Sequence, residues 1–132
     1  SRLFIVPGIL LAMTLAVMMY YGYKFGLLPN GIWYDKIMHT LGGAGGCVLA
    51  FCVITNLPDR WRWSFLRFGL PLIGLAAGLF FGGWWEVLEV QLPVITDYVP
   101  QGVWDTTFDV VFDCVGGCIA GKKYQKIWRW QQ

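Results

Sequence analysis

The chain has 132 residues, of which 57% are hydrophobic and only 14% are charged. A soluble globular domain carries about 25% charged residues, so this composition excludes an ordinary soluble domain and predicts an integral membrane protein. The net charge is only +2, and the expected partner is the lipid bilayer and not a nucleic acid. The length suits one domain, and we expect a single transmembrane domain over residues 1–132.

Four apolar runs predict four transmembrane helices, at residues 3–23, 32–55, 64–91 and 105–121. Each run is long enough to cross a hydrocarbon core roughly 30 Å thick. The first run ends in aromatic residues, which suit a membrane interface better than the small residues of a signal-peptide cleavage site, so we expect it to be retained. Residues 122–132 are a basic, aromatic tail.

The distribution of lysine and arginine predicts the orientation. In a four-span topology, only Lys24 and Lys36 fall on one side of the membrane. The other eight basic residues fall on the opposite side: Arg2, Arg60, Arg62, Arg67, Lys122, Lys123, Lys126 and Arg129. Basic residues concentrate in the cytoplasm. The expected fold is therefore an all-α bundle of four transmembrane helices with both termini cytoplasmic, in a bacterial inner membrane.

The fourth run carries an acidic residue at every fourth position, followed by two glycines at the same spacing: Asp105, Asp109, Asp113, Gly117 and Gly121. The third run has glycines at 74, 78 and 82 that lead to Glu86. Residues four apart share a helix face, and small residues on a face let membrane helices pack closely. We therefore expect the acidic side chains to face the neighbouring helices.

The predicted topology brings polar side chains from three runs to one depth. His39, Glu86 and Asp109 are expected on the order of 5–10 Å below the outer boundary, from the helical rise of 1.5 Å per residue. Six carboxylates then have only Lys36 and His39 as basic partners: Asp35, Glu86, Glu89, Asp105, Asp109 and Asp113. A buried charge costs several kcal/mol unless it is compensated, so these groups are protonated, exposed to water or bound to a cation.

A divalent metal ion is the cation that this residue set favours. The predicted ligands are His39, Glu86, Glu89, Asp109 and Asp113, with Asp35 and Asp105 as accessory residues. Oxygen-rich sites suit Mg²⁺, Ca²⁺ or Mn²⁺, and a histidine adds Zn²⁺ or Fe²⁺. Simpler interpretations stay open: Asp35 and Lys36 as interfacial charges, Asp105 as a helix cap, and His39 as a hydrogen-bonded packing residue.

The same motifs resemble a known group of membrane proteins. Over residues 33–121 the chain reads Asp35-Lys-x-x-His39, Glu86-x-x-Glu89 and Asp105-x-x-x-Asp109-x-x-x-Asp113-x-x-Gly116. This set resembles the VanZ-like membrane proteins and the related YjdF-like inner-membrane family. Asp113 and Glu89 stand where VanZ-like proteins have Asn and Gln, which is closer to the YjdF-like pattern. The resemblance implies a small multi-helix inner-membrane protein and supplies no agreed reaction.

Three functions remain open from the sequence. The first is a metal-binding protein with a site near the outer face, for which catalysis is an open question. The second is a non-catalytic structural or accessory subunit of a larger membrane complex, such as a respiratory or photosynthetic assembly. The third is a proton or ion pathway, although no acidic residue follows Asp113 in the fourth run. Nucleotide-binding, deaminase, metalloprotease and Ser-His-Asp patterns are absent, so no reaction is predicted.

The four cysteines, at positions 47, 52, 114 and 118, lie in apolar runs without a CxxC pattern. Buried thiols of this kind behave as small hydrophobic residues. Unpaired thiols are therefore the favoured interpretation, and a structural disulfide stays open.

Overall fold

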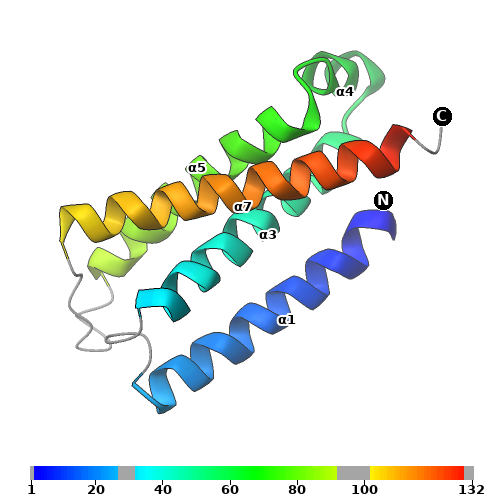
Figure 1. The fold of residues 1–132 in the computed structure, drawn as a ribbon. Helices are drawn as coiled ribbons and strands as arrows, with labels where there is room; N and C mark the ends of the chain where they lie inside the picture. Colours follow the sequence, from blue (N-terminus) through cyan, green and yellow to red (C-terminus); the bar gives the residue numbers. More distant parts are fainter. Residues whose placement is uncertain (1, 27–31, 92–101, 130–132) are drawn as a thin grey trace.

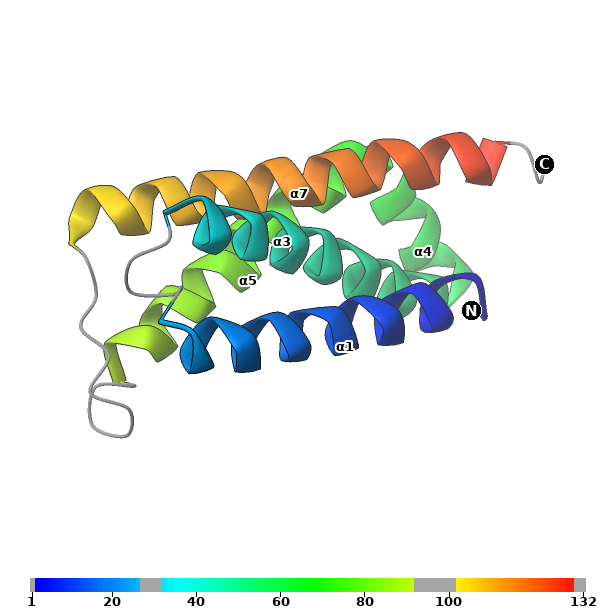
Figure 2. The same cartoon turned by 60° about the horizontal axis from the view of Figure 1, so that its bottom comes forward.

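The computed structural model describes residues 2–26, 32–91 and 102–129, and the regular structure in these ranges is entirely helical. The helices are α1 (Arg2–Lys24), α3 (Ile32–Thr55), α4 (Asp59–Leu66), α5 (Leu70–Gln91) and α7 (Val103–Arg129). Helices α3, α5 and α7 lie side by side along the bundle, and α1 lies beside α3 (Figures 1 and 2). The all-α fold class is confirmed for the described residues.

Three of these helices are long and apolar enough to cross a membrane, by length and composition: Ile5–Gly22, Trp33–Thr55 and Leu70–Leu88. Helix α7 is longer than any of them, with 27 residues, but its three aspartates and its basic end lower its hydropathy. The structure therefore supports three of the four predicted spans. The fourth span and the orientation of the termini stay predictions, and most of both predicted outer loops, at 24–31 and 92–104, lies outside the described residues.

Two helix boundaries differ from the boundaries predicted for the spans. The third run was expected to begin at residue 64, but residues 59–66 form the separate helix α4, and α5 begins at Leu70. Between them Gly69 has a φ of 83°, a left-handed conformation that costs glycine little. The fourth helix was expected to end at Gly121 and continues to Arg129, because residues 122–129 contain no glycine or proline to stop it.

Glycines allow α3, α5 and α7 to approach until their backbones touch. A Cβ atom on Gly43 of α3, or on Gly78 of α5, would overlap the backbone of Asp113 in α7. A Cβ on Gly116 of α7 would overlap the backbone of Thr40 in α3. Any larger residue at these positions would push the helices apart. Two of these three contacts are with the backbone of Asp113, so a buried acid lies at one of the close contacts between the helices.

The interior changes character along the three helices. Toward the end that carries α4, buried Cys47, Val48, Phe51 and Leu70 form an apolar cluster, and the ring of Tyr124 meets Phe51 edge-on. All four cysteines are free thiols, as expected. The buried polar residues lie toward the opposite end, where α3 and α7 begin and α5 ends (Figure 1).

Candidate metal centre

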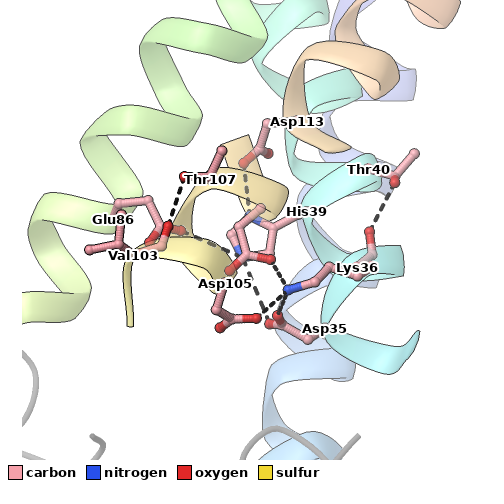
Figure 3. A network of polar contacts seen from close by, with 10 residues as sticks. Asp35, Lys36, His39, Thr40, Glu86, Val103, Asp105, Thr107 and Asp113 are labelled. Carbon is pink, nitrogen blue, oxygen red and sulfur yellow. Dashed lines mark hydrogen bonds and ion pairs between the residues drawn. The ribbon is translucent and has the colours of Figure 1, made fainter. Parts of the chain in front are cut away.

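A cluster of charged side chains lies between α3, α5 and α7, and we call it the polar cluster. Its members are Asp35, Lys36 and His39 from α3, Glu86 from α5, and Asp105, Asp109 and Asp113 from α7. Apart from Asp105, each residue is between 2% and 8% exposed. Figure 3 shows side chains from all three helices pointing toward one another. Buried charges of this number require compensation within the cluster.

His39 occupies the middle of the polar cluster and its two ring nitrogens face different partners. Nδ1 lies 2.8 Å from Oδ2 of Asp113. In the neutral ring, this contact favours the tautomer in which Nδ1–H donates to the carboxylate and Nε2 keeps its lone pair. A metal-bound histidine commonly donates its other N–H to a carboxylate in this way.

The second nitrogen of His39 faces three carboxylates, one from each helix. Nε2 is 3.7 Å from Oδ1 of Asp35 and 3.7 Å from Oδ1 of Asp109. It is also 3.9 Å from Oε1 of Glu86. Nε2 of His39 therefore has a carboxylate oxygen from each helix of the three-helix core within 3.9 Å.

These separations are close to those of a metal site. One ligand atom each from Asp35, His39 and Asp109 lie within 4.8 Å of one another. Ligands bound at about 2.0–2.3 Å from an ion are themselves about 3.0–3.5 Å apart. The three side chains would therefore have to draw closer together to bind one ion.

Glu86 supplies an independent sign that a positive group belongs beside Nε2 of His39. Its side chain is 10% exposed, and Oε1 is buried without a hydrogen-bond partner among the described residues. An unsatisfied buried acceptor costs about 1–3 kcal/mol, and more if it is charged. The same atom points toward Nε2 of His39, so a cation held by His39 would also satisfy Glu86.

Lys36 is the only ammonium group in the polar cluster. Its Nζ lies 3.0 Å from Oδ2 of Asp35 and 2.8 Å from Oδ1 of Asp105, and it also donates to Oδ1 of Asp109. One ammonium therefore binds three of the five carboxylates. The interfacial role considered for Lys36 does not fit this burial. The sequence signal that we undervalued is its place beside Asp35, one turn before His39.

The predicted site residues are placed unequally. The structure brings together His39, Glu86, Asp109 and Asp113, and it also brings in Asp35, which we expected only as an accessory. Asp113 meets the Nδ1 side of His39, away from the other carboxylates. Among the described residues of the polar cluster, Asp105 contacts Lys36. Glu89 lies in the last turn of α5, but its side chain is outside the described residues.

Comparison with known proteins gives one family. A family model described as "predicted membrane protein (DUF2238)" matches residues 2–126, nearly the whole chain. That description supports a small membrane protein, states no activity and carries neither of the names suggested by the motifs, VanZ-like or YjdF-like. No curated protein and no solved structure matches the chain.

Proposed function

This chain belongs to the DUF2238 family of predicted membrane proteins, and we propose that it binds one divalent metal ion inside its helix bundle. The ligands are Asp35, His39, Glu86 and Asp109. The observation that carries the proposal is the arrangement around Nε2 of His39, which three carboxylate oxygens from three helices approach within 3.9 Å. Asp113 holds the other ring nitrogen and so directs Nε2 at the ion.

The charge of the polar cluster supports a divalent ion. Five carboxylates are gathered around one ammonium group, and burial makes uncompensated negative charge expensive. A divalent ion supplies two positive charges and accepts the lone pairs of Asp35, Glu86 and Asp109 at once. One nitrogen with several oxygens suits Mn²⁺, Fe²⁺ or Zn²⁺. In an octahedral ion, four such ligands leave two positions for water or a substrate.

An ion pathway through the bundle has less support. Residues 40–55 of α3, 70–85 of α5 and 114–121 of α7 contain no charged side chain. The polar cluster therefore has no acidic or basic continuation along the core toward the end that carries α4. A bound ion would stay at one end of the bundle.

We also propose that α7 is the fourth transmembrane span. The protein would then lie in a bacterial inner membrane with both termini in the cytoplasm. Helix α7 runs beside α3 and α5 along their length (Figure 2), and its Asp109 and Asp113 are buried between them. The metal centre then lies toward the outer face. Single cysteines at Asn30 and Gln101, in a variant without the native cysteines, should react with an impermeant thiol reagent added outside. Labelling only from the cytoplasmic side would show that the protein has the opposite orientation.

Metal analysis tests the metal proposal. Untagged protein is purified in detergent, stripped with a chelator, reloaded with Mn²⁺ or Zn²⁺ and desalted. The parent protein should retain about one ion per chain, and His39→Gln and Glu86→Gln should retain much less. Asp59→Asn is a matched control, because Asp59 is an exposed acid in α4 that pairs with Arg62 and has no described contact with the polar cluster. A parent protein that retains no more metal than His39→Gln would overturn the proposal.

A further inference from the structure

We propose that the polar cluster holds two cation positions side by side and that the ammonium of Lys36 permanently fills the second. The first position is the metal site around Nε2 of His39, so the inference rests on the proposed function and extends it. The second position is defined by the carboxylates of Asp35, Asp105 and Asp109. Lys36 would then be the residue that limits the centre to one exchangeable ion.

The surroundings of Lys36 resemble those of a bound metal more than those of a simple ion pair. Its side chain is 7% exposed, and Nζ meets oxygens of three different carboxylates. Those carboxylates come from both α3 and α7. A simple ion pair needs one partner, whereas three converging carboxylates form the oxygen-rich environment that hard divalent ions prefer.

Two of the three carboxylates serve both positions. Asp35 directs Oδ2 to Lys36 at 3.0 Å and Oδ1 toward Nε2 of His39 at 3.7 Å. Oδ1 of Asp109 accepts a hydrogen bond from Lys36 and lies 3.7 Å from the same Nε2. Centres with two metal ions about 3.5–4 Å apart, and di-metal sites in helix bundles, are likewise built from carboxylates of facing helices. Here one of the two positions is occupied by a side chain.

Asp105 separates the two positions experimentally. It contacts Lys36 at 2.8 Å, but no described contact joins it to His39. Glu86 is its counterpart, because it approaches His39 and has no described contact with Lys36. Removing the charge of Asp105 should therefore affect the second position alone, and removing that of Glu86 should affect the first.

A fixed ammonium in the second position has a physical consequence. Lys36 cannot dissociate, so it keeps Asp35 and Asp109 together when the metal leaves, and it supplies only one positive charge where a divalent ion would supply two. The remaining negative charge would allow a second divalent ion to enter once the ammonium is removed. Replacing Lys36 by a small residue should therefore convert a one-ion centre into a two-ion centre.

Counting Mn²⁺ ions in the parent, Lys36→Ala and Lys36→Arg proteins tests the inference. The parent and Lys36→Arg should retain about one ion per chain, and Lys36→Ala about two, with the electron paramagnetic resonance signal of a spin-coupled pair. In the Lys36→Ala background, Asp105→Asn should remove the second ion and leave the first. One uncoupled ion in Lys36→Ala would overturn the inference while leaving the proposed function intact. No ion in the parent would overturn the proposed function and with it the inference, whereas one ion in the parent and none in Lys36→Ala would overturn the inference alone.

A variant with lysine retained keeps the test decisive if Lys36→Ala does not fold. Asp105 is the most exposed acid of the polar cluster, with a side chain 24% exposed, so Asp105→Asn should be tolerated. The inference assigns it to the Lys36 position only, and Asp105→Asn alone should therefore still retain one Mn²⁺ ion per chain. Loss of that ion would place Asp105 in the metal site and overturn the division into two positions.

Discussion

Helices α1 and α3 are equally apolar and differ greatly in how they pack. The candidate spans of α1 and α3 share a mean hydropathy of 1.8, yet 6% of the first and 39% of the second is buried. Helix α1 packs mainly against α3, and its apolar side chains are largely exposed. Hydropathy therefore identifies helices suited to a membrane, but it does not tell which of them pack closely.

Small residues and acids on the same face account for the difference. In a bilayer, apolar side chains gain little by leaving lipid for another helix, so close backbone contacts and polar interactions hold helices together. The core has both, because its glycines meet the backbone of Asp113 and its carboxylates meet Lys36 and His39. Helix α1 has no acid, and its side-chain hydrogen bond to the core comes from Tyr34, which donates to the carbonyl of Met18.

The largest expected effect comes from breaking the close packing of the core. Gly78→Leu should destabilise the protein by about 3 kcal/mol or prevent folding, because its side chain would displace the backbone of α7. Gly83→Leu on the same helix is the matched control, since nothing lies within 4 Å of a Cβ at that position. Thermal unfolding in detergent measures both. Equal melting temperatures for the two variants would show that the close glycine contacts do not stabilise the core.

Removing the metal should loosen the core and leave α1 unchanged. A ligand at 100 times its Kd stabilises the folded state by about 2.7 kcal/mol, and this ion would join α3, α5 and α7. Hydrogen exchange should therefore increase in those three helices when the ion is stripped, with no change in α1. His39→Gln should show no response to added metal. A uniform increase in hydrogen exchange across all helices would contradict a metal ion that joins only α3, α5 and α7.

The contact between α1 and the core should contribute less. Tyr34→Phe removes the hydrogen bond to Met18, and such bonds in membrane proteins average about 0.6 kcal/mol and reach about 1.7. We expect a loss in this range, measured by unfolding in detergent, with faster hydrogen exchange in α1. Tyr20→Phe is the control, because Tyr20 is 61% exposed. A loss of stability above about 3 kcal/mol would mean that the contact with α1 stabilises the fold as much as the contacts within the core do.

The smallest effect is expected on the outer face of α1. Leu10 is 59% exposed, so Leu10→Ala should change stability by less than about 0.5 kcal/mol. Leu70→Ala, at a position 6% exposed in the apolar cluster, should cost about 2–5 kcal/mol. Comparing their unfolding in the same detergent measures how far burial decides the cost. A similar loss at both positions would show that α1 is covered in the folded protein.

The sequence predicted the spans and the convergence of the acids better than the contacts between them. The predicted range 32–55 matches helix α3, because helix-breaking residues flank it in the sequence: Pro29, Asn30 and Gly31 before it, and Asn56 and Pro58 after it. The start of α5 was missed, because the composition of Ser64, Phe65 and Leu66 suits either a membrane helix or the short helix α4. Periodicity placed Asp109 and Asp113 on the inner face, where the structure has them.

Individual partners could not be predicted, because they depend on helix rotation and on side-chain length. One helix turn separates Asp109 from Asp113, yet Asp109 faces Lys36 and Asp113 faces Nδ1 of His39. Lys36 looked like an interfacial charge because its four-carbon stem hides how far its ammonium reaches inward. Asp35 looked peripheral because it lies in the first turn of α3, and the sequence alone does not show how far the neighbouring helices bury it.

The most direct test of the proposed metal centre is to identify the residue that binds the ion. The chain contains one histidine, so in untagged protein any imidazole coupling to a bound ion comes from His39. Pulsed electron paramagnetic resonance of Mn²⁺-loaded protein should show the coupling of one imidazole ¹⁴N nucleus, and His39→Gln should abolish it. Bound Mn²⁺ with no imidazole coupling in the parent protein would contradict a metal centre built around Nε2 of His39.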